Sequence, residues 1–215
     1  STSRGLGDVY KRQVKELSAM GCLDGANRIT DAGLAALAPY RVDNAVIMAA
    51  GMSSRFAPLS YEKPKALLKV KGEVLIEREI RQLQAAGIDD ITVVVGYMKE
   101  KLFYLEDRFH VKIVINEDYH RYNNPSTLML VRDRLKNTFI CSSDNYFEQN
   151  PFEPYVYQAY YASLYSAGKT DEYCMVTNRK GRITGVQVGG SDAWYMFGHV
   201  YFDPVSYTHL RAHET

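Results

Sequence analysis

Short apolar runs alternate with amphipathic stretches through the middle of the chain, and this alternation is what most constrains its fold. The runs have the length of buried strands, and the stretches between them carry apolar residues three and four positions apart, as helices do. The expected strands are 45–48, 91–95, 111–115 and 138–141, and the expected helices are 75–86, 98–109 and 124–135. This order predicts an α/β domain with a mostly parallel sheet, helices on both faces, and a ligand site at the carboxyl ends of the strands.

The first expected strand runs into a loop of small residues. The loop reads Met48-Ala-Ala-Gly-Met-Ser-Ser-Arg55 and is followed by Glu62-Lys-Pro-Lys65. Small side chains let backbone N–H groups approach phosphate oxygens closely, hydroxyls add donors, and the two cations supply positive charge. The alternative is that Gly51 is an ordinary turn glycine beside solvated cations. The position directly after a strand favours binding of a nucleoside triphosphate.

This segment resembles the nucleotidyltransferase signature A-A-G-x-G-[ST]-R followed by K-P-K, with Ser53 in place of the second glycine. Four later motifs are similar, in order and spacing, to those of the bacterial phosphocholine cytidylyltransferases: Val95-Gly-Tyr-Met-Lys99, Asn116-Glu-Asp-Tyr119, Tyr122-Asn-Asn124 and Ser143-Asp-Asn-Tyr146. The resemblance covers residues 43–203. It implies a Rossmann-like nucleotidyltransferase fold and an enzyme that transfers CMP from CTP to phosphocholine for cell-surface decoration, with release of pyrophosphate.

The resemblance also implies which residues form the site. The catalytic residues would be Lys65, Arg55 and Asp144, and Asp144 would hold Mg²⁺. The nucleotide would contact Ala49, Ala50, Gly51, Met52, Ser53, Ser54, Arg55, Gly96, Asn124 and Thr127. Tyr173 and Tyr195, with Trp194 as a further candidate, would hold the quaternary ammonium of choline by their aromatic faces. The alternatives are that Asp144 and Asn124 only cap local turns and that the tyrosines only pack the sheet.

Two further function classes remain open. A sugar-1-phosphate nucleotidyltransferase would share the loop, Lys65 and Asp144, but would have polar sugar-binding residues in place of an aromatic site. A non-enzymatic regulator would sense CTP and bind DNA through an N-terminal module. The presence of Arg55, Lys65 and Asp144 argues against a degenerate domain.

Residues 14–40 resemble part of a winged-helix module. The pattern predicts a helix over 14–20, a turn region over 21–28, a helix that begins at Thr30 or Asp31 and ends near Leu37, and a linker over 39–43. The segment has few cations and no recognition helix, so a packing role is favoured over DNA binding.

Both ends of the chain resemble translated sequencing adapters. Permitted codons for Ser3 to Gln13 spell an adapter string whose reverse complement encodes Pro204 to Thr215. We therefore expect 1–13 and 204–215 to be disordered scars and the nucleotidyltransferase domain, 41–203, to be incomplete at its C-terminus and weakly active. After Phe152 the tyrosine-rich pattern predicts strands over 155–165, 173–176, 183–188 and 193–201.

Composition sets the remaining expectations. The 26 basic and 25 acidic residues nearly balance, which gives no global attraction to nucleic acid or a membrane surface. Three cysteines without a C-x-x-C pair are typical of buried free thiols in a reducing compartment. The sequence thus predicts a cytoplasmic enzyme with CTP and phosphocholine as substrates and no membrane partner, and it leaves the oligomeric state open.

Overall fold

The computed structural model describes residues 2–52, 58, 61–120 and 124–206, without the side chains of 2–6 and 124–126. The chain divides into two compact units, Ser1–Arg41 and Val42–Thr215. No helix in these described ranges is both long enough and apolar enough to cross a membrane.

The first unit contains helices α1 (Thr2–Ala19) and α2 (Asp31–Leu37) and the 3₁₀ turn η1 (Ala38–Tyr40). Thr30 caps α2, because its Oγ1 accepts a hydrogen bond from the Gly33 N–H at 3.1 Å, as the sequence predicted. Gly33 is buried, and a Cβ there would lie 2.4 Å from the Cys22 carbonyl oxygen. The winged-helix interpretation stays a prediction.

The expectation of a disordered N-terminal segment is wrong. Helix α1 runs without interruption through the part attributed to an adapter. An α-helix satisfies its backbone by bonds four residues apart, so it can form without packing on a domain. The C-terminal part from 207 on lies outside the described residues.

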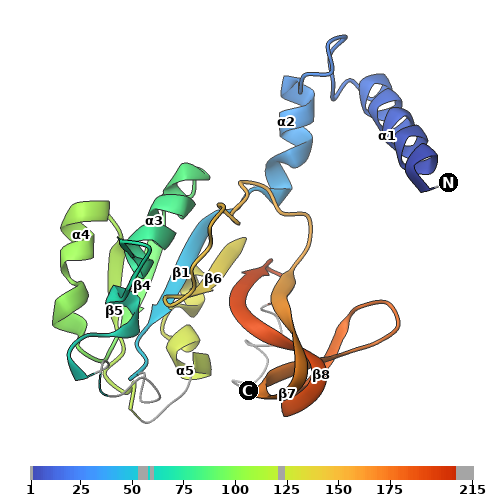
Figure 1. Ribbon diagram of the computed structural model, residues 1–215. Coiled ribbons are helices and arrows are strands. Elements are labelled where there is room, and N and C mark those ends of the chain that lie inside the picture. Colours follow the sequence, from blue (N-terminus) through green and yellow to red (C-terminus); the bar gives the residue numbers. More distant parts are fainter. Residues whose placement is uncertain (1, 53–57, 59–60, 121–123, 207–215) are drawn as a thin grey trace, which may run out of the picture. The chain divides into compact units, whose positions relative to one another are not determined.

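In the described part of the second unit, six strands form one sheet. They are β1 (Asn44–Ala49), β4 (Ile91–Val95), β5 (Lys112–Ile115), β6 (Thr138–Ser142), β7 (Tyr160–Thr177) and β8 (Ile183–Phe202). Their order is β5-β4-β1-β6-β8-β7 (Figure 1). The first four are parallel, β8 is antiparallel to β6, and β7 is antiparallel to β8. The predicted mostly parallel α/β architecture is confirmed.

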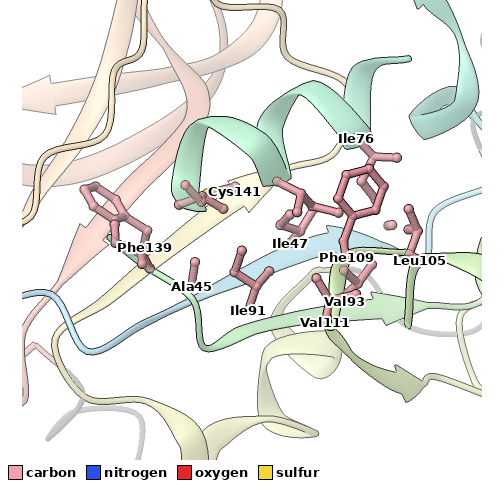
Figure 2. Packing of buried hydrophobic residues seen from close by; sticks show 14 of the residues in the cluster. Ala45, Ile47, Ile76, Ile91, Val93, Leu105, Phe109, Val111, Phe139 and Cys141 are labelled. Carbon is pink, nitrogen blue, oxygen red and sulfur yellow. The ribbon is translucent and has the colours of Figure 1, made fainter. Parts of the chain in front are cut away.

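Helices cover both faces of the parallel part. On one face, Ile47 and Val93 pack with apolar residues of α3 (Leu75–Ala85) and α4 (Tyr104–Phe109), and Figure 2 shows Ile76 of α3 within this cluster. On the other face, Val46 and Val94 pack with residues from and after α5 (Asn124–Met129). Successive strand residues point to opposite faces, so one apolar strand serves both layers.

Three predicted elements need correction. The helix expected over 98–109 is the 3₁₀ turn η5 (Lys99–Leu102) followed by α4, because Met98 has a left-handed backbone with φ +52°. The helix expected to reach Leu135 ends at Met129, and the 3₁₀ turn η6 (Arg132–Arg134) follows it. The tyrosine-rich segments form two long strands in place of four short ones, since β-bulges absorb the interruptions while pairing continues.

A small hairpin links the turn η4 to helix α3. The turn η4 (Lys65–Leu67) leads into β2 (Lys69–Val70), which pairs with β3 (Glu73–Val74) directly before α3. Ala66 is buried, so the backbone of η4 is fixed against the core at the residue that follows Lys65.

Candidate active site

The loop after β1 lies beside the loop after β4. The N–H of Tyr97 donates to the carbonyl of Ala50 at 3.2 Å. A Cβ on Gly96 would lie 2.9 Å from that carbonyl oxygen and 2.7 Å from Cβ of Tyr119, so only glycine fits this approach. The structure therefore brings Gly51 and Gly96 to one rim of the sheet, as the parallel strands require.

Lys65 and Asp144 meet across this rim. Lys65 begins η4, and Asp144 follows the end of β6 by two residues. The Lys65 Nζ donates to Oδ2 of Asp144 at 3.3 Å, and the two side chains are 20% and 38% exposed. Both charges remain reachable by a ligand, while each offsets part of the other's desolvation.

A cavity of about 680 Å³ opens over this pair. One wall comes from the ends of β1 and β6 and from η4, and the other comes from β7 and β8. Its lining residues are Met48, Ala49, Gly51, Pro64, Lys65, Ala66, Ser142, Ser143, Asp144, Asn145, Tyr161, Asp171, Glu172, Tyr173, Tyr195, Met196, Phe197 and Gly198. A cavity of this size suits a nucleotide or a drug-sized ligand.

The wall from β7 and β8 is aromatic and acidic. Tyr161, Tyr173 and Tyr195 line it, together with the carboxylates of Asp171 and Glu172. The sequence predicted Tyr173 and Tyr195 for this position. The sequence analysis did not predict Tyr161, Asp171 or Glu172. Neither the spacing nor the composition of the sequence distinguishes these residues, and they line the cavity only because of how β7 pairs with β8.

Trp194 and Thr127 lie elsewhere. Trp194 does not line the cavity; it is 54% exposed and packs edge-on against Tyr165, with ring centroids 5.4 Å apart. The buried Thr127 hydroxyl accepts a hydrogen bond from the Asn116 amide at 2.9 Å. This internal bond gives Thr127 a structural role, and its contact with a nucleotide stays a prediction.

The remaining residues predicted to bind the nucleotide fall into three groups. Ala49 and Gly51 line the cavity, whereas the buried Ala50 and the half-exposed Met52 do not. Asn124 is the first residue of α5 and its side chain is outside the described atoms, so its capping role and its contact with the nucleotide both stay predictions. Ser53, Ser54 and Arg55 lie outside the described residues.

Close packing between β6 and β8 fixes the floor of the cavity. Gly198 has φ +73°, and a Cβ there would lie 2.3 Å from Oγ of Ser142. The Asn145 side-chain amide donates to the carbonyl of Phe197 at 3.0 Å. A side chain at position 198 would therefore push β8 away from the loop that carries Asp144. No sequence motif pointed to this glycine.

Two buried titratable groups lie behind the cavity. Glu79 of α3 is 2% exposed, and neither of its carboxyl oxygens has a hydrogen-bond partner in the described structure. Burial, together with the negative charge of Asp144, raises the pKa of Glu79 well above its usual range. His199 of β8 is also buried, and burial lowers its pKa to about 4. Burial thus favours the uncharged form of both side chains.

Comparisons with known proteins agree with this geometry. A choline-phosphate cytidylyltransferase of Streptococcus pneumoniae is 34% identical over 159 residues, which is 74% of this chain and 69% of that protein. A 2-aminoethylphosphonate cytidylyltransferase of Lancefieldella rimae is 37% identical over 163 residues, 74% of this chain and 66% of that protein. The chain thus spans about two thirds of the length of these curated relatives.

The fold comparison gives the same result. The solved CTP:phosphocholine cytidylyltransferase of Streptococcus pneumoniae superposes with a TM-score of 0.71 at 31% identity, over 80% of this chain and 79% of that one. The model of the MobA-like NTP transferase domain matches residues 45–183. These residues include β1 from its second residue on, η4 and Asp144. The chain therefore belongs to the MobA-like NTP transferase family and has the nucleotidyltransferase fold that its strand-loop signature predicted.

Proposed function

We propose that the chain transfers CMP from CTP to phosphocholine. The observation that carries this proposal is the two-sided cavity. Its sheet-end wall carries Lys65, whose positive charge suits a triphosphate, and Asp144, whose carboxylate suits a divalent cation bound to that triphosphate. Its β7–β8 wall carries aromatic rings and carboxylates, which suit a cationic acceptor. The relatives named above support the nucleotide and the acceptor class.

The reaction is an in-line substitution at phosphorus. A phosphate oxygen of the acceptor attacks the α-phosphorus of CTP, a new P–O bond forms, and the bond to the β-phosphate oxygen breaks as pyrophosphate leaves. The acceptor phosphate is already anionic at neutral pH, so no general base is required. Catalysis then consists of alignment and charge neutralisation, and Lys65, which lines the cavity together with Gly51, would supply positive charge for it.

A divalent metal fits this arrangement. Mg²⁺ is commonly held by one or two carboxylates plus substrate phosphates. Asp144 supplies such a carboxylate, and no cluster of three or more His, Cys, Asp or Glu in the described ranges forms a fully protein-bound site. When bound, Mg²⁺ would neutralise charge on the phosphates. We expect Asp144→Asn to weaken Mg²⁺-dependent turnover more than CTP binding; a Mg²⁺ titration unchanged from the parent would make Asp144 only a turn residue.

Acceptor recognition follows from the chemistry of the trimethylammonium group. This group has no N–H to donate, so aromatic faces hold it, at about 0.5–2 kcal/mol for each ring. Tyr173 is 57% exposed at the cavity wall and is available for such a contact. The charges of Asp171 and Glu172 add attraction without requiring a hydrogen bond.

A second acceptor, 2-aminoethylphosphonate, is favoured by one observation. Its primary ammonium has three N–H donors, and the carboxylates of Asp171 and Glu172 on the same wall can accept from them. The 37% identical relative also carries that activity in its name. The balance between ring contacts and carboxylate hydrogen bonds therefore decides between the two acceptors.

The test is a matrix of nucleotides and acceptors monitored by pyrophosphate release. CTP is combined with phosphocholine, 2-aminoethylphosphonate, phosphoethanolamine and glucose 1-phosphate, and UTP and GTP serve as alternatives. We expect CTP with phosphocholine to give the highest kcat/KM. A higher value for glucose 1-phosphate would assign the chain to sugar nucleotide synthesis, and CTP binding without turnover would favour a regulatory protein.

Two variants localise the preference. Tyr173→Ala should reduce kcat/KM for phosphocholine by roughly 3- to 30-fold, the equivalent of one cation–π contact. Tyr173→Phe keeps the aromatic face and is the matched control, with activity near the parent. Asp171→Asn should reduce use of 2-aminoethylphosphonate more than use of phosphocholine. Equal effects of Tyr173→Ala and Asp171→Asn on both acceptors would refute recognition by this wall.

A further inference from the structure

The outer part of the β7–β8 hairpin, residues 173–190, is locally cationic in a chain that is globally balanced. This distal hairpin contains Arg179, Lys180 and Arg182 and no Asp or Glu. All three cations are exposed at the turn between the strands. The turn is well formed, because the Asn178 Oδ1 accepts hydrogen bonds from the N–H groups of Lys180 and Arg182 at 2.9 and 3.1 Å.

An exposed apolar surface adjoins these cations. Cross-strand pairing sets Tyr173 opposite Val188 and Met175 opposite Val186. Val188 is 72% exposed and Val186 is 49% exposed. Val176 and Ile183, nearer the turn, are 43% and 45% exposed. Val186 and Val188 lie on the face of the hairpin that carries Tyr173, and Val176 lies on the other face by strand alternation, so exposed aliphatic side chains occur on both faces beside the turn.

We propose that the distal hairpin docks on the surface of a bilayer that contains anionic lipids. Apolar side chains beside a cationic tip match such a surface, since the cations meet lipid phosphates while the aliphatic groups enter the boundary between headgroups and acyl chains. The balance of 26 basic and 25 acidic residues in the whole chain conceals this local excess of positive charge.

A second copy of the chain fits this surface less well. In a twofold dimer the distal hairpin meets a second distal hairpin, which has no Asp or Glu to pair with Arg179, Lys180 and Arg182. A bilayer supplies the opposite charge. Tyr173 belongs both to the distal hairpin and to the cavity wall, so docking would hold the cavity close to the lipid surface. This inference does not depend on the proposed acceptor.

The test is co-sedimentation of the whole chain with vesicles. We expect binding to phosphatidylcholine vesicles that contain phosphatidylglycerol, and little binding to phosphatidylcholine alone. Each cation near an anionic surface is worth about fivefold in affinity, so Arg179→Gln, Lys180→Gln and Arg182→Gln combined should weaken binding roughly 100-fold. The matched control changes three exposed lysines of the same unit, Lys69, Lys112 and Lys136, to Gln and should keep binding near the parent.

Four results would overturn the proposal. One is a lack of binding to anionic vesicles, and another is an equal loss of binding in the control triple variant. The third is unchanged binding of Val186→Ser with Val188→Ser, which would mean that the apolar surface does not enter the lipid. Dimers that form without lipid and disappear in that double variant would assign the surface to a second copy instead.

Discussion

His199 should make the stability of the second unit depend on pH in the acid range. The imidazole lies among the rings of Phe139, Phe147 and Phe152, with centroid distances of 5.1 to 5.4 Å, and its Nε2 is 3.0 Å from the Tyr160 hydroxyl. Its Nδ1 has no hydrogen-bond partner among the described residues. A proton added to this ring would create a buried charge with no counter-ion in the cluster.

The magnitude follows from the two pKa values. Burial lowers the pKa of His199 from 6.5 to about 4. The unfolded chain therefore takes up a proton as the pH falls below 6.5, while the folded chain does not, and stability is lost between these two values. At about 1.4 kcal/mol for each pH unit, the free energy of unfolding should fall by about 3 kcal/mol between pH 7 and pH 4 from this residue alone.

The assay is urea unfolding at a series of pH values, followed by the fluorescence of Trp194, the single tryptophan, which lies in β8 with His199. His199→Gln cannot gain a charge, so the difference between parent and variant isolates the histidine from the carboxyl groups that titrate nearby. His120→Gln, at an exposed position, is the control and should keep the parent's slope. Parallel curves for the parent and His199→Gln would refute the reasoning.

Three further changes test other parts of the structure. Lys65→Ala should reduce kcat by about 10²–10³-fold with little change in melting temperature, since a rim lysine contributes to the transition state more than to the core; unchanged turnover would remove it from the mechanism. The free energy of unfolding of Glu79→Gln should rise relative to that of the parent as the pH increases above 4.5, because burial disfavours ionisation of Glu79 in the folded chain while the unfolded chain ionises; unfolding curves at about pH 5 and pH 8 measure this, and equal differences would contradict it. Gly198→Ala should lower the free energy of unfolding in urea by about 2–4 kcal/mol, because the backbone at this position is left-handed and an added methyl group would clash with Ser142. Gly185→Ala is the control, since the nearest atom to an added methyl group there is 3.9 Å away.

The parallel half of the fold could be predicted from the sequence because its signals are local. The residues of β4 are all buried, and the strand reads as the continuous apolar run expected for a parallel sheet with both faces covered. Helix α3 ends within one residue of its predicted end, next to Gly87, which has φ +77°. The predictions failed where the backbone departs from regular geometry without a glycine or proline, as at Met98.

The sequence predicted the cavity residues at the ends of the parallel strands but missed the acidic residues of β7, and this difference has a physical cause. Ala49 ends β1, and Gly51 and Asp144 each follow a parallel strand by two residues. Parallel strands bring their carboxyl ends to one edge whatever the rest of the chain does. Asp171 and Glu172 lie in the middle of a long strand. Their position beside the cavity depends on how β7 pairs with β8, which no local pattern specifies.

That pairing contains several bulges, and they decide which side chains of the hairpin reach the cavity. A strand alternates its side chains between two faces, so one inserted residue moves every later side chain to the other face. The register shifts between Ser166 and Lys169, and again between Thr170 and Tyr173. Strict alternation through this stretch would separate the consecutive residues Asp171, Glu172 and Tyr173, yet all three line the cavity. The β7–β8 wall of the cavity is therefore a product of irregular strand pairing, and changes in bulge position offer a way to test its proposed role in acceptor choice while the sheet edge stays constant.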